Sequence, residues 1–311
     1  MSFTLRFALV LAAGVVAAIV LSPFIAAALA ASGFHLPFPR IFDRTVMATL
    51  LIAILSNARR FRLRERIARG FARAGKNAPR GLRGFAIGIA AIAILWAIAA
   101  TLGGQGAPAI SGLVHRAFKY VPAAVLIAII EEGFFRAFLL DGMKADFGMR
   151  GAVAASSAAY ALAHLVRSPA RFYVVGLEPT VGARNVAAVA AQFADPHTAL
   201  PAMIGLVLIG LVLGEAFVLT GTVYFSIGMH AGLIVGLKSW PAIVADRSAL
   251  PRWLFGNGRF PLVSGVAAWA VAAVILALIR PLAKGGKTRR RDGGGDGAAR
   301  RKPAASRAGA S

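Results

Sequence analysis

Eight runs of apolar residues divide this sequence and limit the folds that it can adopt. They cover about residues 7–31, 43–56, 84–102, 118–141, 151–166, 200–219, 222–238 and 260–279. A helix needs roughly 20 residues to cross the hydrocarbon core of a bilayer, which several of these runs provide. With 58% hydrophobic residues and a mean hydropathy of +0.72, the chain is too apolar for a soluble domain. The sequence therefore predicts an all-α fold, a polytopic transmembrane helix bundle of about eight spans.

The basic residues gather in two segments beside apolar runs, which makes them a signal of topology. Residues 57–83 contain ten arginines and lysines against the single acid Glu65, and 282–311 is also basic. Short basic segments remain in the cytoplasm, so we expect an integral protein of the cell inner (plasma) membrane with both termini cytoplasmic. The net charge of +23 then calls for no nucleic-acid partner. A signal peptide ending near 28–30 is the alternative for the first run.

The same segments divide the chain into three parts. Residues 1–83 would hold the N-terminal transmembrane helices and the basic cytoplasmic loop, and 84–281 the main membrane domain. Residues 282–311 form a glycine-rich basic tail that is too polar to bury a core, so it is expected to be disordered. Part of the loop, about 59–71, could be a helix lying on anionic lipid with Phe61, Leu63 and Ile67 directed inward. A solvated loop is the alternative.

Three charged side chains, Glu131, Glu132 and Arg136, interrupt the fourth apolar run. Each ionisable group at membrane depth costs about 2.5 to 3.5 kcal/mol on insertion scales, so it needs a partner or a function. Glu132 and Arg136 are four residues apart and share one helix face, whereas Glu131 points elsewhere. The arginine can therefore neutralise one carboxylate and leave Glu131 for chemistry. A cluster that only fixes helix packing is the alternative.

Two later apolar runs each contain one histidine. His164 follows Tyr160 by four residues, so both side chains lie on one helix face and can line one cavity. His230 lies among glycine and alanine residues, which leave room for a ligand. Either histidine alone would be typical of packing. Together with Glu131 they predict a set of general bases and hydrogen-bond donors.

Three short motifs in the region 118–238 resemble a known family. They read, in order, Glu131-Glu132-Gly-Phe-Phe-Arg136, Tyr160-Ala-Leu-Ala-His164 and His230-Ala-Gly-Leu-Ile234. This order resembles the CAAX-protease and bacteriocin-processing (CPBP, or Abi) family of intramembrane endopeptidases, which includes the CAAX prenyl protease. The family usually has phenylalanine at the position of Tyr160 and asparagine at that of Ile234.

The resemblance implies a CAAX-protease-like core within 84–281 and a peptide hydrolase that needs no cofactor. It gives Glu131 the role of general base with His164 assisting, so that a water attacks a peptide carbonyl. His230 would orient water or stabilise the oxyanion, while Glu132 and Arg136 form a structural pair and Tyr160 supports the site. The substrate would be a membrane-anchored peptide or protein.

Other functions fit the same residues. Glu131, His164 and His230 also form a two-histidine, one-carboxylate set, so zinc is an alternative cofactor, although the His-Glu-x-x-His spacing of zinc proteases is absent. A proton-coupled transporter could use these groups as a relay. A membrane scaffold without proteolysis is a third possibility, which Ile234 in place of the asparagine favours. Because the chain has no cysteine, disulfides and thiolate chemistry are excluded.

Overall fold

A computed structural model describes residues 1–102, 110–166, 171–244, 250–256 and 260–284. Within these ranges the chain forms helices and no strand, which confirms the predicted all-α class. The basic tail, 282–311, was expected to be disordered. All but its first three residues lie outside the described ranges. Those three continue the last helix.

Each predicted apolar run lies on a long helix. These helices are α1 (Phe3–Ala31), α2 (Phe38–Ser56), α5 (Ala74–Thr101), α6 (Ile110–Glu132) with η1 (Gly133–Leu140), α7 (Asp141–Leu165), α9 (Pro196–Thr220), α10 (Tyr224–Ile243) and α12 (Val266–Lys284). The short elements between them are α3 (Ala58–Phe61), α4 (Leu63–Gly70), α8 (Val181–Ala191), η2 (Gln192–Ala194) and α11 (Arg252–Phe255). Runs of apolar residues thus predicted where the helices lie, though not all of their ends.

Four of the described helices are long and apolar enough to cross a membrane. They are α1, α5, α9 and residues Val266–Ala283 of α12. The other long helices, α2, α6, α7 and α10, are not among these four in the described part of the chain. These four helices indicate an integral membrane protein. The larger number of about eight spans stays a prediction.

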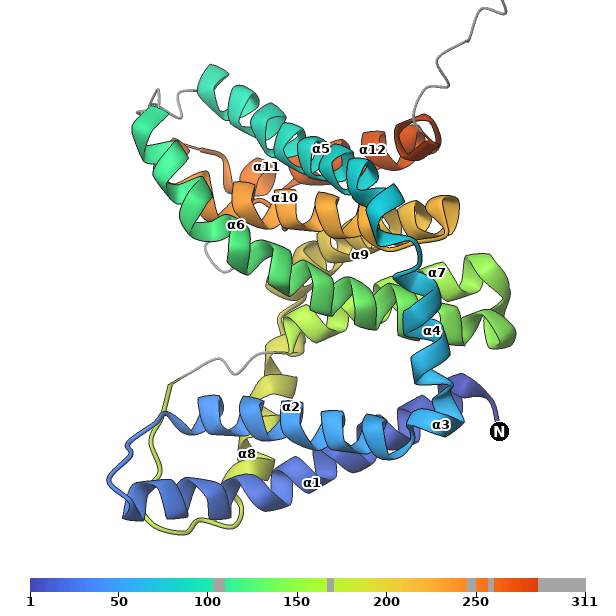
Figure 1. Cartoon of the computed structure of the whole chain (residues 1–311). Coiled ribbons are helices and arrows are strands. Elements are labelled where there is room, and N and C mark those ends of the chain that lie inside the picture. The colour runs from blue at the N-terminus through green and yellow to red at the C-terminus, as the bar shows by residue number, and fades with distance from the viewer. Residues whose placement is uncertain (103–109, 167–170, 245–249, 257–259, 285–311) are drawn as a thin grey trace, which may run out of the picture.

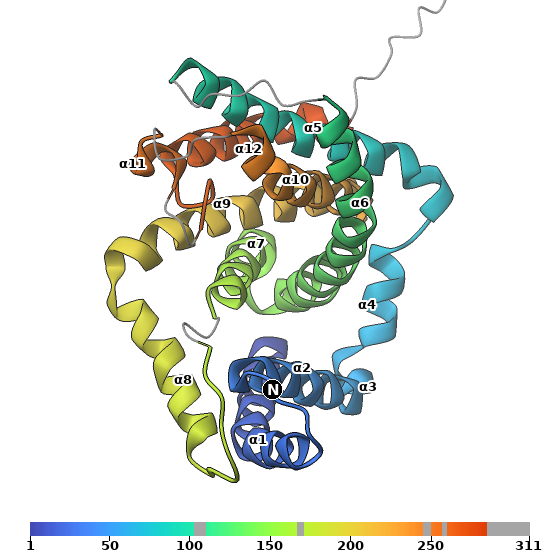
Figure 2. The same cartoon turned by 90° about the vertical axis from the view of Figure 1, so that its left-hand side faces the viewer.

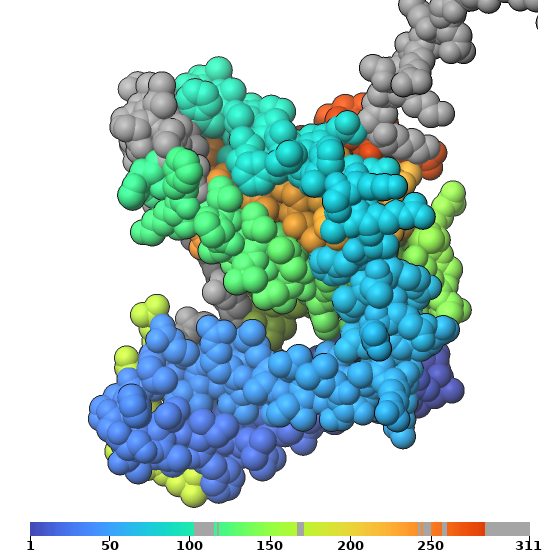
Figure 3. Space-filling model, in the orientation of Figure 1, coloured from blue at the N-terminus to red at the C-terminus, as the bar shows by residue number. Residues whose placement is uncertain are grey.

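The helices form two groups (Figure 1). α5, α6, α7, α9, α10 and α12 make the main bundle, in which α10 contacts α5, α6 and α9, and α7 lies on the side that faces α1 and α2 in the view of Figure 2. α1 and α2 pack on each other as a hairpin, α8 lies against α1, and α4 contacts η1 and so connects the hairpin to the bundle. Figure 3 shows the surface hollowed between α2 and α6. The Glu-Glu-x-x-x-Arg motif lies in the bundle.

The basic segment 57–83 differs from both structures that the sequence suggested. Phe61 is 1% exposed and packs edge-on against Phe3 and Phe138, with ring centroids 5.4 and 5.5 Å apart. Leu63 and Ile67 are partly buried against the same core. The apolar side chains expected to enter lipid therefore contact protein, because aromatic residues of α1 and η1 offer them a closer apolar surface.

Residues 142–150, between the fourth and fifth apolar runs, are helical. α7 begins at Asp141, and only Gly148 departs from helical angles, with φ 66° and ψ 178°. Asp141 accepts from both Arg66 and Arg69 at 2.8 Å, and Asp146 accepts from the Thr4 hydroxyl at 2.6 Å. The charged side chains at the start of α7 therefore make contacts with α4 and α1. The eighth run also begins later than expected, at Val266, since residues 261–264 form turns.

Glycines allow α5 and α10 to lie in close contact. A Cβ atom added at Gly228 would clash with the carbonyl oxygen of Gly81, and one at Gly232 would clash with that of Phe85. Small residues let helix backbones approach in this way in membranes. Because Gly228 and Gly232 flank His230 on α10, this contact fixes the position of the histidine relative to α5.

We expect Gly228→Ala to destabilise the protein by about 1 to 3 kcal/mol, the usual cost of inserting a methyl group into a packed interior. Thermal melting in detergent measures this effect. Gly75→Ala on α5 is the matched control, because a Cβ atom there meets nothing within 4 Å. Equal melting temperatures for the two variants would contradict the close contact.

Candidate active site

The two glutamates of the motif lie where α6 passes into the π-helical turn η1. Glu132 and Arg136 are both 0% exposed, and the Arg136 Nε atom lies 3.2 Å from a Glu132 carboxylate oxygen. The predicted ion pair is therefore confirmed. Glu131 points away from Arg136, as helix spacing predicted, and lines a cavity. The wider turn was not predicted; such turns are frequent at functional sites.

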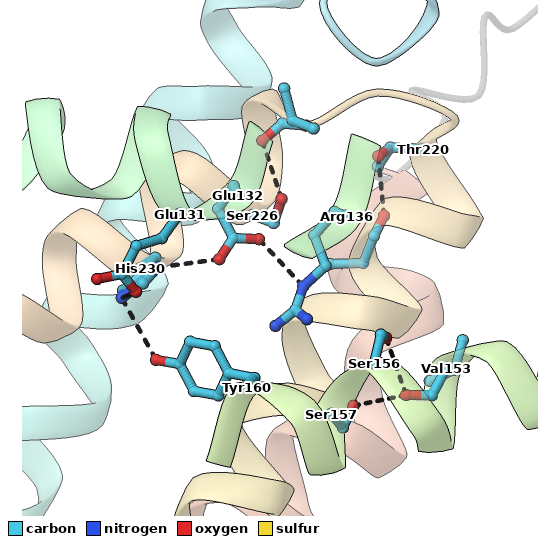
Figure 4. Close-up of polar contacts among 12 residues, drawn as sticks. Glu131, Glu132, Arg136, Val153, Ser156, Ser157, Tyr160, Thr220, Ser226 and His230 are labelled. Carbon is cyan, nitrogen blue, oxygen red and sulfur yellow. Dashed lines mark hydrogen bonds and ion pairs between the residues drawn. The ribbon is translucent and has the colours of Figure 1, made fainter. Parts of the chain in front are cut away.

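His164 and His230 reach Glu131 from two other helices, as Figure 4 shows for His230. The Nε2 atom of His164 on α7 lies 3.4 Å from a Glu131 carboxylate oxygen, and that of His230 on α10 lies 3.7 Å from the same oxygen. These three residues come from distant parts of the sequence. The structure thus brings together every residue that the sequence predicted for catalysis.

The other ring nitrogen of each histidine has its own partner. His164 Nδ1 lies 2.9 Å from the Tyr160 carbonyl oxygen, and His230 Nδ1 lies 2.9 Å from a Glu132 oxygen. Carbonyl and carboxylate oxygens only accept hydrogen bonds, so Nδ1 donates in both contacts. Nε2 is therefore the ring nitrogen that each histidine turns towards Glu131.

Glu132 connects the ion pair to the histidine. One of its oxygens accepts from His230 and the other faces Arg136 (Figure 4). The guanidinium carbon of Arg136 lies 5.3 Å from the centroid of the Tyr160 ring, and the Tyr160 hydroxyl makes a long contact of 3.5 Å with His230 Nε2. Glu132 is thus compensated on both sides. The sequence predicted only Arg136 as a partner of Glu132.

The Glu131 carboxylate opens into a cavity of about 780 Å³ between α5, α6, α7, α9, α10 and α12. The Glu131 side chain is 26% exposed and that of His164 31%, whereas that of His230 is 5% exposed. A molecule in the cavity can therefore touch Glu131 and His164 directly. Ile234, at the position of the family's asparagine, also lines it and offers no hydrogen-bond donor.

In the part of the chain that the structure describes, no group of three or more His, Asp or Glu residues is arranged to hold a metal ion. The zinc alternative would need Glu131, His164 and His230 as ligands. The oxygen of Glu131 is shared at 3.4 and 3.7 Å by the two Nε2 atoms. Both distances are longer than the roughly 2.7 to 3.2 Å of an ordinary N–H···O hydrogen bond.

The chain is thus a helical membrane protein in which apolar helices surround a carboxylate and two histidines. Residues 113–234 match the family model described as "Type II CAAX prenyl endopeptidase Rce1-like". This region carries all three motifs, so the match confirms the predicted relationship to the CAAX protease family, a family of membrane proteases. Searches of curated proteins and of solved structures gave no match.

Proposed function

We propose that the protein is an intramembrane endopeptidase that hydrolyses a peptide bond in a membrane-associated protein or peptide. The observation that carries this proposal is the Glu131 carboxylate, which faces the cavity with two histidine Nε2 atoms beside it. The neighbouring Glu132 is fully buried and paired. One carboxylate is thereby held for structure and the other is available to a substrate.

In the proposed reaction Glu131, assisted by His164, accepts a proton from a water molecule, and the hydroxide attacks the carbonyl carbon of the substrate. A positioned general base of this kind contributes about 10²- to 10⁴-fold to a rate. Protonated Glu131 then gives its proton to the leaving nitrogen as the C–N bond breaks. The products are one carboxylic acid and one amine, and Glu131 returns to its carboxylate form, so atoms and charge balance.

His230 has the second role in this proposal. Its Nδ1–H is held by Glu132, so Nε2 can accept from the attacking water. In the imidazolium form the same atom would donate to the oxyanion, a type of stabilisation that is large in catalysis. The Tyr160 hydroxyl, close to this Nε2, is a further donor. These two groups would replace the donor that Ile234 does not provide.

The topology expected from the basic segments agrees with the packing. α4 lies in the basic segment and has two contacts of interest. Its Arg66 pairs with Asp141 at the start of α7. Its Gly70 carbonyl accepts a backbone hydrogen bond of 3.0 Å from Val223, in the reversal between α9 and α10. These three segments would share one side of the membrane in the eight-span arrangement. This supports an inner-membrane protein with cytoplasmic termini, and a substrate cut within or beside its apolar anchor.

The proposal predicts that the protein, purified in detergent, cleaves a membrane-tethered reporter peptide and that 1,10-phenanthroline leaves the rate unchanged. Mass spectrometry of the products measures cleavage. Loss of cleavage that zinc restores would instead support the zinc alternative, with the same three residues as ligands. Transport of protons without peptide cleavage in liposomes would favour the transporter.

A further inference from the structure

The basic segment 57–83 is fixed to the rest of the protein at several points. Near its middle, Arg66 pairs with Asp141 at 2.8 Å. Further along, the Tyr224 hydroxyl donates to the Phe71 carbonyl at 2.9 Å, and the two rings pack edge-on with centroids 6.1 Å apart. The backbone of this segment is therefore held in place by the bundle, and its apolar side chains contact protein.

Most cations of this segment have no acidic partner. Glu65 pairs with Arg62, and Asp141 pairs with Arg66 and Arg69. Within the residues that the structure describes, the remaining cations are mostly exposed, with side chains that form no ion pair or hydrogen bond. Those cations, here called the basic surface, are Arg59, Arg60, Arg64, Arg73, Lys76 and Arg83.

The basic surface lies on consecutive elements along one edge of the molecule. α3, α4 and the start of α5 lead from the α1–α2 hairpin to the main bundle, at the right-hand side of both Figure 1 and Figure 2. Like charges that are held close together repel one another, which destabilises the fold unless anions gather around them. The basic surface is therefore suited to an anionic partner that offers several negative groups.

The course of α5 indicates which anions are nearest. Its first part contains Lys76, Arg80 and Arg83, and residues 84–101 then contain no charged side chain. α5 is also one of the helices that are long and apolar enough to cross a membrane. Where such a helix changes from apolar to basic, it leaves the hydrocarbon and enters the headgroup layer. The nearest anions are therefore lipid phosphates.

We propose that the basic surface binds the phosphate groups of anionic phospholipids in the adjoining leaflet. Each cation near an anionic membrane surface strengthens binding by about 5-fold, and the anchored segment presents several cations at once. Because α4 contacts η1, bound lipid would also stabilise the turn that carries Arg136. The proposal goes beyond peptide hydrolysis and does not depend on it.

Lipid binding tests the basic surface directly. The full-length protein in an uncharged detergent is titrated with mixed micelles that contain phosphatidylglycerol, and micelles with zwitterionic phosphatidylcholine are the control. We expect phosphatidylglycerol to bind at least about 10-fold more tightly and to raise the melting temperature as its mole fraction rises. Salt at about 1 M should remove most of this difference, because it screens exposed charges.

A variant that combines Arg59→Gln, Arg64→Gln and Lys76→Gln should bind phosphatidylglycerol about 10²-fold more weakly. Its binding of phosphatidylcholine should not change. These side chains are exposed and have no partner in the described part of the chain, so the fold does not depend on them. An unchanged melting temperature without lipid would show that the variant is folded.

The matched control combines Arg40→Gln, Arg171→Gln and Arg252→Gln. It removes the same positive charge from exposed arginines that lie outside the basic segment. It should bind phosphatidylglycerol as tightly as the unsubstituted protein does. An equal loss in the two triple variants would show that only net charge matters and would overturn the proposal.

Soluble anions separate a lipid from other partners of the basic surface. Glycerol 3-phosphate offers the phosphate without acyl chains, and a hexaglutamate peptide imitates an acidic protein. Neither should displace phosphatidylglycerol at an equal concentration. Displacement by either one, or equal binding of the two lipids, would overturn the proposal. Cleavage of the reporter peptide is measured separately, so these results leave the endopeptidase proposal unaffected.

Discussion

Glu131→Gln is expected to lower the rate of peptide hydrolysis by at least about 10²- to 10⁴-fold while leaving the protein folded. Glutamine keeps the shape of the side chain but cannot take a proton from water at neutral pH. Because Glu131 is partly exposed to the cavity and the buried ion pair uses Glu132, the substitution removes no pairing on which the fold depends. Cleavage of the tethered reporter and thermal melting measure the two effects.

His164→Ala should give a similar loss of activity with a small change in melting temperature, because the His164 side chain is 31% exposed. Glu215→Gln is the matched control on α9, since this glutamate does not line the cavity. Comparing the membrane proteomes of wild-type and Glu131→Gln cells would reveal the substrate as an accumulating membrane protein. Full activity of Glu131→Gln would refute the proposed mechanism.

Most helices could be predicted from the sequence because each one requires a local apolar run. The structures of segments 57–83 and 142–150 could not be predicted in this way, for one physical reason. Their charges look solvated in the sequence, yet Arg66 and Arg69 each pair with Asp141 across more than 70 positions. Hydropathy cannot show such pairing, since it averages over neighbours in the sequence and ignores neighbours in space.

In the candidate site, too, some contacts could be predicted from local sequence and others could not. Helix spacing alone predicted the Glu132–Arg136 pair and the separate direction of Glu131. The contact between Glu132 and His230 joins residues 98 positions apart, and no local pattern indicates it. The order of the three motifs identified the two histidines. That Arg116 and Lys238 line the same cavity could not be predicted, because it depends on the packing of α6 against α10.

Arg136→Ala is expected to lower stability by about 3 to 5 kcal/mol, the cost of leaving one partner of a buried ion pair without its counter-charge. Both members of the pair are 0% exposed, so no water can replace the guanidinium around Glu132. The variant also loses the contact with the Tyr160 ring. Detergent-extracted yield and melting temperature should both fall, more than in Arg150→Ala, where the arginine is exposed.

The double substitution Glu132→Gln with Arg136→Ala separates the stranded charge from the lost packing. Removing the carboxylate abolishes the uncompensated charge, so the double variant should melt at a higher temperature than Arg136→Ala alone. It should remain below wild type, because His230 Nδ1 then donates to a neutral amide oxygen and the contact of the guanidinium with the Tyr160 ring is lost. If Arg136→Ala instead gave the yield of wild type and the activity loss of Glu131→Gln, Arg136 would act in catalysis, and Glu132 would tolerate burial without it.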